Sequence, residues 1–453
     1  MVPLIRRHQG RGEASTAVDH TLGAMAFVIP IGVLLWMQFS SHGSPVSTVL
    51  LCLLAGKLIT AQWSRLLTKR SRMSAIPSST PTRNLRVSLV MPLHNEDPTF
   101  AVAAIKSMLG QTQLPHHIHV VDDGSTDGSA AIEAVQAALD ELAEPGTWTV
   151  SRFARNLGKR HALAHGFRAD PAADVFLCVD SDTVLDPHAI EEGIRPFADP
   201  RVASVAGVVS AQNWSRNILT RLIDLRYISA FLSERAAYSV FGAVLCCCGS
   251  LAFYRADVVR DNLDDFLDQR FLGSVATFGD DRRLTNYALR AGKVVLCESS
   301  RASTGVPERL GHYVRQQLRW NKSFVRESMW VLGTFPLKAS AFWLTLCEVL
   351  AWVLVSTLFI VSLAIWPFTD SSPSLWGFAG LVALAAYARN AAYLQDTHAD
   401  MRRRDRIAVF LLAPLYGILH IVVLTPIRVW ALLTLADTAW GTRSEVEVRF
   451  LAR

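Results

Sequence analysis

Hydrophobic positions along this chain fall into three blocks. Residues 21–40 and 46–63 are apolar runs of about 20 positions, enough for a helix to cross a ~30 Å hydrocarbon core. Residues 85–305 mix short apolar runs with charged segments. Long apolar runs then return, at 342–368, 375–394 and 406–435. The pattern predicts a globular domain inserted between membrane-spanning helices.

The middle block alternates between two periods. Short apolar runs typical of buried strands occur at 85–93, 117–123 and 174–182. Helical patterns separate or follow them, at 99–110, 128–143 and 159–169. Such alternation predicts a largely parallel sheet covered on both faces. In these sheets ligands bind beyond the carboxyl ends of the strands.

Charged flanks orient the apolar runs. Arg65, Lys69 and Arg70 follow the second run, and cytoplasmic flanks are enriched in such residues. A signal peptide is the weaker alternative for the first run, because a second run follows almost at once. The last run contains Pro414 and Pro426 and is too long for one span, which favours a broken or re-entrant pair.

These observations divide the chain into seven segments. We expect a cytoplasmic N-terminal segment (1–20), two transmembrane helices (21–64), a linker (65–86), a cytoplasmic α/β domain (87–305), interfacial amphipathic helices (306–335), further transmembrane helices (336–435) and a cytoplasmic C-terminal segment (436–453). The expected location is the plasma membrane, crossed several times.

Composition narrows the function classes. The 453 residues are 51% hydrophobic and 19% charged, too apolar for an ordinary soluble enzyme and too charged for a purely membranous chain. The net charge of +6 collects beside apolar runs, which indicates membrane orientation rather than nucleic-acid binding. Seven cysteines without C-x-x-C pairing fit neither a disulfide framework nor a zinc site.

Acidic residues follow two of the predicted strands. In Asp180-Ser181-Asp182 an extended backbone would point both carboxylates to one side, where they could share Mg²⁺ or Mn²⁺ with substrate phosphates. Asp123 ends the second strand; a plain turn and a carboxylate that accepts a hydrogen bond from a base N–H are both open.

Three further motifs carry candidate chemistry. The segment from Asn156 to Arg160 is either a plain basic loop or a loop that brings a positively charged side chain to a diphosphate. Asp281 opens a helical pattern, where an acid is commonly a cap, but it can also take a proton from an acceptor hydroxyl. Gln316 to Trp320 forms either an amphipathic interfacial helix or a site that passes product into the membrane.

A resemblance covers most of the chain. The ordered set PLHNED, VVDDGSTD, NLGKRHA, DSD, CCCGS, GDDRRLTN, QQLRW and WGTR resembles the processive family-2 glycosyltransferases. Within them it is most similar to hyaluronan synthases, and related to rhizobial chitooligosaccharide synthases and chitin synthases. The resemblance implies a GT-A-like nucleotide-sugar transferase domain with a mostly parallel sheet, embedded between transmembrane helices. It also implies inverting transfer from UDP-α-sugars into a β-linked polymer.

By position, the resemblance assigns roles to individual residues. Asp281 would be the general base and Asp182 would hold Mg²⁺ or Mn²⁺. The nucleotide sugar would be bound by Glu96, Asp123, Lys159, Asp180 and Arg319. The acceptor would be bound by Cys248, Gly249, Ser250, Gln316 and Trp320. An active-site or gating loop would be formed by Trp440, Gly441, Thr442 and Arg443.

Several products remain open. Hyaluronan synthesis needs UDP-N-acetylglucosamine and UDP-glucuronate, a growing polysaccharide and a lipid bilayer as partners. Gly249-Ser250-Leu251 departs from the Gly-Pro-Leu usual in hyaluronan synthases, so a chitin-type or poly-N-acetylglucosamine synthase is the second hypothesis. A transferase acting on a lipid phosphate is a third. A sugar transporter or membrane sugar-binding protein without catalysis is a fourth, which replacing Asp281 by Asn would discriminate.

Overall fold

The computed structural model describes residues 85–126, 130–365, 375–395 and 401–437, together with isolated positions between residues 24 and 59. The two predicted N-terminal transmembrane helices and the linker lie almost wholly outside the described residues. So does the Trp440–Arg443 motif. What the sequence predicts for these segments stays a prediction.

The described residues form an eight-stranded sheet in the order β3-β2-β1-β4-β7-β6-β10-β5. Its strands are β1 (Val87–Leu93), β2 (His117–Asp122), β3 (Trp148–Arg152), β4 (Val175–Cys178), β5 (Thr183–Leu185), β6 (Val202–Ala211), β7 (Ala252–Arg255) and β10 (Lys293–Thr304). A separate hairpin pairs β8 (Arg270–Phe271) with β9 (Ser274–Val275).

The strand directions confirm a mostly parallel sheet. The half made of β3, β2, β1 and β4 is entirely parallel, and β6 runs parallel to β10. Strand β7 lies antiparallel between β4 and β6, and β5 pairs antiparallel with β10. Strand β3 was not predicted: its five residues are only half-buried, so the continuous apolar run that marks β1 is missing.

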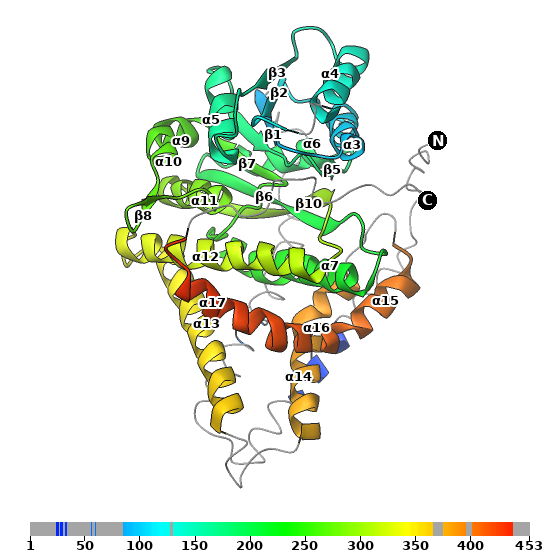
Figure 1. Ribbon diagram of the computed structural model, residues 1–453, viewed down its shortest axis with the longest axis vertical. Coiled ribbons are helices and arrows are strands. Elements are labelled where there is room, and N and C mark those ends of the chain that lie inside the picture. Colours follow the sequence, from blue (N-terminus) through cyan, green and yellow to red (C-terminus); the bar gives the residue numbers. More distant parts are fainter. Residues whose placement is uncertain are drawn as a thin grey trace.

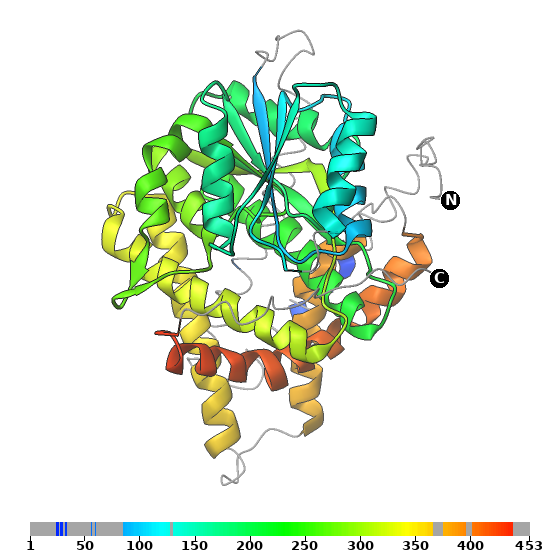
Figure 2. The same cartoon turned by 45° about the horizontal axis from the view of Figure 1, so that its top comes forward.

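Helices cover both faces of the sheet. Their bounds are α3 (Pro98–Leu109), α4 (Ala130–Leu142), α5 (Lys159–Ala169), α6 (Ala189–Ile194), α7 (Ile218–Ser229), α8 (Ala236–Val240), α9 (Ala256–Asp261), α10 (Leu263–Leu267) and α11 (Asp280–Ala291). Single turns of other helix types are η1 (Arg195–Ala198) and the π-helical η2 (Ala230–Arg235). Figure 2 shows the sheet between these helices.

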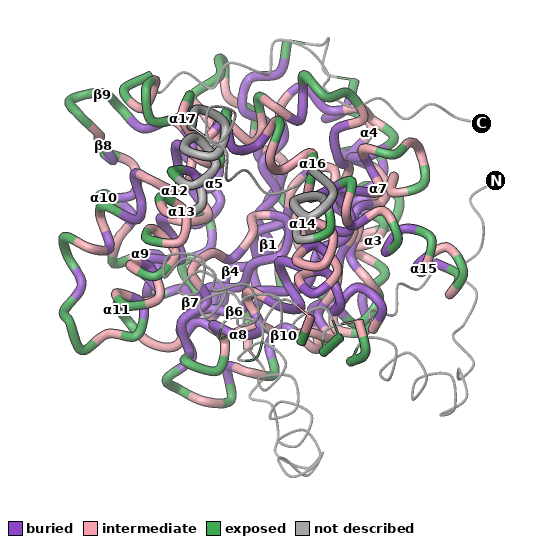
Figure 3. The backbone as a smooth tube through the Cα atoms, turned by 90° about the horizontal axis from the view of Figure 1, so that it is seen from below, coloured by how far each residue is buried: buried purple, intermediate pink, exposed green. Residues whose placement is uncertain are grey.

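Two apolar cores result, one on each face. One contains side chains from α3, α4 and α6, such as Ile105, Val135 and Ile190. The other contains side chains from α5 and α11, such as Phe167 and Leu284. The central strands lie between the two cores and are buried along their length (Figure 3). Burial on both faces explains why these strands read as continuous apolar runs in the sequence.

The remaining helices lie below the sheet. They are α12 (Leu310–Thr334), α13 (Ser340–Ile365), α14 (Leu375–Asn390), η4 (Ala391–Gln395), α15 (Arg403–Leu411), α16 (Ala413–Leu419), the π-helical η5 (His420–Leu424) and α17 (Thr425–Leu433). Helix α12 runs along the underside of the α/β domain with α17 beside it, whereas α13 and α14 extend away from the domain (Figure 1).

The described residues include one of the predicted membrane segments. Among the described residues, the helical run Arg403–Leu433 is long and apolar enough to cross a membrane. It is broken after Leu411, just before Pro414, and again by the π-helical turn η5, as its prolines predicted. Helices α15, α16 and α17 follow one another beneath the α/β domain, and α13 and α14 extend past them (Figure 1).

Candidate active site

A cavity of about 630 Å³ opens where the parallel strands end. Its floor comes from the loops after β1, β2 and β4, and its other walls come from α11 and α12. Most of the residues proposed from the sequence line it, namely Asp123, Lys159, Asp180, Asp182, Cys248, Gly249, Ser250, Asp281, Gln316, Arg319 and Trp320. The structure therefore brings together side chains that are almost 200 positions apart in the chain.

Asp180 and Asp182 sit in a turn, so the prediction of an extended backbone was wrong. The N–H of Thr183 donates to the carbonyl of Asp180 at 3.1 Å. Strand β4 ends at Cys178, and the chain must leave it for β5 at the far edge of the sheet, which forces the corner. The two carboxylates consequently have different neighbours.

Polar contacts fix both carboxylates. The hydroxyl of Ser250 donates to Oδ2 of Asp180 at 2.9 Å, and Lys159 Nζ forms an ion pair with Oδ1. Thr304 Oγ1 donates to Oδ1 of Asp182 at 2.9 Å. A Cβ added to Gly249 would lie 3.2 Å from Lys159 Nζ, so the absence of a side chain there keeps the ammonium uncrowded.

Lys159 is the first residue of α5, and the backbone at Gly158 has a φ of 99°. Burial opposes the charge of Lys159, but the Asp180 carboxylate outweighs it and raises the pKa of the ammonium. The side chain therefore stays protonated at neutral pH. An ammonium beside a helix N-terminus is chemistry that suits a phosphate group.

Asp123 shapes the loop before α5. Its carboxylate accepts hydrogen bonds from the N–H of Leu157 at 2.7 Å and from the N–H of Gly158 at 2.9 Å. Burial raises the pKa of Asp123, and these two hydrogen bonds act against that rise. Next to it, Gly124 has a φ of +65° and approaches Arg155 so closely that a Cβ would lie 2.3 Å from its carbonyl carbon.

Glu96 lies outside the cavity lining. It is 6% exposed, and its Oε2 accepts a hydrogen bond from Ser181 Oγ at 2.9 Å. Its Oε1 accepts from the N–H of Asp97. Direct contact with a nucleotide sugar is therefore not supported by this geometry. The contact with Ser181 instead supports the turn that carries Asp180 and Asp182.

The two acids that open α11 have different surroundings. Asp280 is buried and forms an ion pair with Arg160 at 2.8 Å. Asp281 is partly exposed on the cavity wall, where its Oδ1 accepts from the N–H of Arg282 at 2.8 Å. Neither acid is the N-cap, which is Gly279 and has no side-chain cap hydrogen bond, so the helix-cap interpretation is wrong and both acids lie in the first turn of α11. Of the two, Asp281 is the one placed to accept a proton from a bound molecule.

The three consecutive cysteines lie beside Asp281. Cys246 Sγ is 3.5 Å from Asp281 Oδ2. Burial, and then the Asp281 charge, raise the pKa of Cys246, and burial raises that of Cys247 to about 11. Both thiols stay protonated at neutral pH, so neither is an activated nucleophile. Cys248 lines the cavity and Cys247 packs in the core.

Helix α12 supplies the opposite wall. Gln316, Arg319 and Trp320 face the cavity, and the Trp320 side chain is 42% exposed. The Trp320 ring lies 6.2 Å from that of Tyr227 on α7, centroid to centroid. An exposed indole face is suited to stack on the C–H surface of a sugar.

Several lining residues were missed from the sequence, including one on α7 and one on η2. Tyr227 and Arg235 both reach the cavity, and Arg235 Nε donates to the carbonyl of Cys246 at 2.9 Å. Arg235 ends the π-helical turn η2, a helix type that often occurs at functional sites. A π-helical turn has no signature in a single sequence, so this placement could not be predicted.

Comparisons with known proteins show the family of this chain. The sequence model described as glycosyl transferase family 2 matches residues 88–263. A hyaluronan synthase of Streptococcus pyogenes is 36% identical over 437 residues, which cover 94% of this chain and 98% of that protein. The chain belongs to the family-2 glycosyltransferases. The resemblance drawn from the sequence motifs is confirmed.

A second relative and a solved structure are also similar to this glycosyltransferase. An N-acetylglucosaminyltransferase of Rhizobium leguminosarum bv. viciae is 32% identical over 384 residues, covering 82% of this chain and 86% of that protein. A solved mannosyltransferase from Pyrobaculum calidifontis, in complex with GDP-mannose and Mn²⁺, matches with a TM-score of 0.53 at 17% identity. That match covers 82% of this chain and 99% of that chain and supports a GT-A-like fold.

Proposed function

We propose that this glycosyltransferase is a membrane-embedded, processive enzyme that polymerises hyaluronan from UDP-glucuronate and UDP-N-acetylglucosamine. The observation that carries the proposal is the 36% identity to a hyaluronan synthase over 94% of this chain. The cavity supports it, because cations, carboxylates and an exposed indole gather where a nucleotide sugar and an acceptor would meet.

In the proposed transfer, each of four cavity side chains has a role. Asp281 accepts the proton of the acceptor hydroxyl as that oxygen bonds to the anomeric carbon of the donor. The bond from this carbon to the diphosphate oxygen breaks on the opposite side, so the configuration inverts. Lys159 and Arg319 stabilise the negative charge that develops on the leaving diphosphate. The indole of Trp320 stacks on the C–H surface of the acceptor sugar.

The carboxylates in the cavity fit a divalent cation that is bound together with the phosphates of the substrate. Asp180 and Asp182 both line the cavity, and Mg²⁺ is commonly held by one or two carboxylates plus phosphate oxygens. Among the described residues, no group of three or more Asp, Glu, His or Cys side chains is arranged for a metal. Bound Mg²⁺ or Mn²⁺ would neutralise charge on the diphosphate.

Export of the product is part of the proposal. We place the catalytic domain in the cytoplasm and the growing chain in a path through the helices after α12. Helix α13 has 26 residues, which at 1.5 Å per residue gives about 39 Å, longer than a hydrocarbon core. Trp440 to Arg443 would form a loop near the site. These assignments rest on the sequence pattern and on the relatives.

Product formation by the purified, detergent-solubilised protein tests this function. The two UDP-sugars are supplied singly and together, with Mg²⁺ or Mn²⁺. Polymer only with both donors, degraded by hyaluronidase, is the expected result. Chitinase-sensitive polymer from UDP-N-acetylglucosamine alone would replace the hyaluronan proposal by the second candidate.

That second candidate is a chitin-type or poly-N-acetylglucosamine synthase. It is favoured by the relative from Rhizobium, named an N-acetylglucosaminyltransferase, and by Ser250. Ser250 stands in the cavity wall, where hyaluronan synthases usually carry proline, and donates to Asp180. Both candidates use the same residues for transfer and differ in the donor that the cavity accepts.

A further inference from the structure

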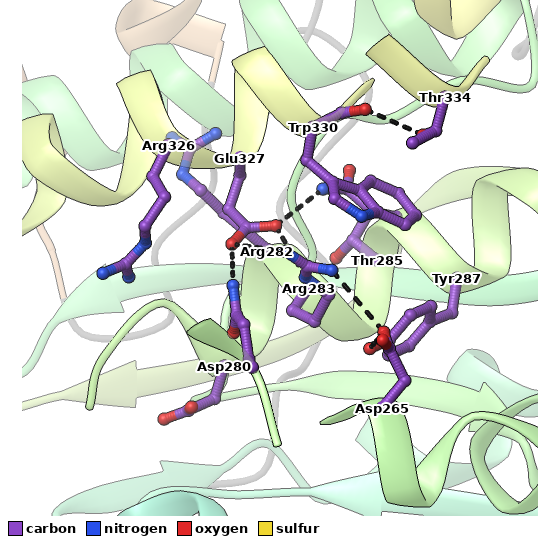
Figure 4. Close-up of polar contacts among 12 residues, drawn as sticks. Asp265, Asp280, Arg282, Arg283, Thr285, Tyr287, Arg326, Glu327, Trp330 and Thr334 are labelled. Atoms are coloured by element: carbon purple, nitrogen blue, oxygen red, sulfur yellow. Dashed lines mark hydrogen bonds and ion pairs between the residues drawn. The ribbon is translucent and has the colours of Figure 1, made fainter. Parts of the chain in front are cut away.

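A buried ionic cluster joins the two helices that carry the candidate base and the candidate acceptor platform (Figure 4). Its centre is Glu327 of α12, which is 2% exposed, paired with Arg283 of α11, which is 5% exposed. Arg283 Nε donates to Glu327 Oε2 at 2.9 Å, and a second guanidinium nitrogen donates to Oε1 at 3.4 Å. The pair is therefore a two-pronged contact shielded from water.

Glu327 is bound from more than one side. Asn286 Nδ2 donates to its Oε2 at 3.1 Å, and Gln269 Nε2 donates to its Oε1. Arg283 in turn lies 3.6 Å from Asp265 and places its guanidinium carbon 4.4 Å from the centre of the Trp330 ring. Both charges are thus compensated, and neither side chain has room to move without leaving another polar group buried.

On both helices, the residues of the cluster are close in sequence to a residue of the candidate active site. Arg283 follows Asp281 by two residues, and Glu327 follows Trp320 by seven, which is about two turns of α12. Residues seven apart share a helix face, so one face of α12 carries both the acceptor platform and the ionic contact.

The turn that precedes Asp281 also rests on α12. Arg326 donates to the carbonyl of Phe278, and its guanidinium carbon lies 4.6 Å from the Phe278 ring centre. Gly279 has a φ of +94°, and a Cβ there would lie 2.5 Å from Ser323 Oγ. The backbone before the candidate base is therefore pressed against the same helix.

We propose that Glu327 is a positioning residue for transfer: through Arg283 it fixes Asp281 at the distance from Trp320 that a bound acceptor hydroxyl requires. This inference rests on the proposed function, in which Asp281 is the base. Glu327 lines no part of the cavity, so its effect is on geometry and not on substrate contact. A small displacement of a base lowers the rate strongly while binding is retained.

Glu327→Gln tests the role, because it keeps the shape and removes the charge that holds Arg283. We expect the kcat of transfer to fall by about 10- to 100-fold, since misplacement by about 1 Å has effects of that size. The KM for the donors and the Kd for UDP should stay within about twofold, because neither Glu327 nor Arg283 lines the cavity in which the donor binds. UDP released per sugar transferred should rise, because a displaced Asp281 no longer favours the acceptor hydroxyl over water.

The ratio of UDP released to sugar transferred separates positioning from stability. A variant that is merely less folded loses hydrolysis, transfer and UDP-binding sites in proportion, so its ratio does not change. Arg283→Lys is the second variant, for use if Glu327→Gln does not fold; it keeps the charge but loses the two-pronged contact. Arg195→Gln, which removes ion pairs with Glu191 and Glu192 outside the cavity lining, is the matched control.

Each outcome has a defined meaning. A raised ratio in Glu327→Gln or Arg283→Lys, with wild-type behaviour in Arg195→Gln, supports the positioning role. A wild-type ratio in both variants, with UDP binding retained, overturns it and leaves the proposed function intact. Wild-type protein that transfers sugar from neither donor overturns the proposed function, and the positioning role with it.

Discussion

Arg160 and Asp280 form an ion pair at 2.8 Å in which the side chains are only 4% and 5% exposed. Arg160 directly follows Lys159, and Asp280 directly precedes Asp281. Asp280 is thus bound to the helix that carries Lys159, and the carboxylate of Asp281 lies partly exposed on the cavity wall. This pair assigns different tasks to two adjacent carboxylates.

Asp281→Asn should abolish transfer without weakening UDP binding. Removal of a general base lowers rates by about 10²- to 10⁴-fold, and asparagine keeps the size of the side chain. Initial rates of sugar incorporation and calorimetric titration with UDP measure the two effects. Asp280→Asn is the comparison: it leaves Arg160 buried without its anion, and we expect a loss of about 3–5 kcal/mol of stability. Transfer that survives in Asp281→Asn would mean that another group is the base.

Asp123→Asn should weaken nucleotide binding through the loop that precedes α5. Each carboxylate oxygen now accepts a backbone hydrogen bond, and an amide can accept at only one of its two positions. Loss of one such bond costs about 1 kcal/mol, which corresponds to roughly a fivefold weaker affinity for UDP. Titration of UDP into the variant measures it. An unchanged Kd would mean that the loop keeps its shape without the carboxylate.

Ser250→Ala should lower the affinity for UDP modestly and leave the product unchanged. The alanine removes the hydroxyl that donates to Asp180 at 2.9 Å, which frees that carboxylate to reorient. An effect of about 1 kcal/mol is expected. The Kd for UDP and the sugar composition of the product are the measurements. A change in which donors are used would contradict this prediction and show that this position selects the sugar.

The stability of the α/β domain should fall between pH 6.5 and pH 4 in part because of His119. Burial, and then the nearby His117, lower the pKa of His119 from 6.5 to about 4. The folded pKa is below the unfolded value, so the neutral ring stabilises the fold above pH 6.5. This contribution, at most about 3 kcal/mol, is lost as the pH falls toward 4.

Thermal midpoints of the wild type and His119→Gln between pH 7.5 and pH 4 measure this contribution. Glutamine does not titrate, so the variant should lose less stability than the wild type over the same range. The two rings of His117 and His119 stack with centroids 4.3 Å apart, so a partial effect of His117 will remain in the variant. Parallel curves for the two proteins would contradict the assignment to His119.

The sequence predicted those parts of the fold that depend on local pattern. Strands β1 and β2 and helices α3 to α5 lie within two residues of the predicted segments, because continuous apolar runs and helical periods reflect burial directly. Strand β3 was missed because an edge strand alternates weakly. The turn at Asp180 was missed because its shape follows from where β5 pairs, on the far side of the sheet.

The site was predictable to the extent that its residues end regular elements. Asp123, Lys159, Asp180 and Asp281 each lie at the end of a strand or the start of a helix, where side chains in α/β domains converge. The supporting contacts were not predictable. Arg283 and Glu327 are 44 positions apart, and Arg160 and Asp280 are 120 apart, so no local pattern relates them.

The ionic contact between α11 and α12 also limits how relatives of this enzyme can be recombined. A chimera that exchanges α12 alone would combine Arg283 of one protein with the helix of another, and the graft would succeed only where both partners match. The smallest portable unit is therefore the segment from Gly279 to Thr334, which keeps the candidate base, the acceptor platform and Glu327 in one piece. Efforts to redesign the product should treat these two helices as a single cassette.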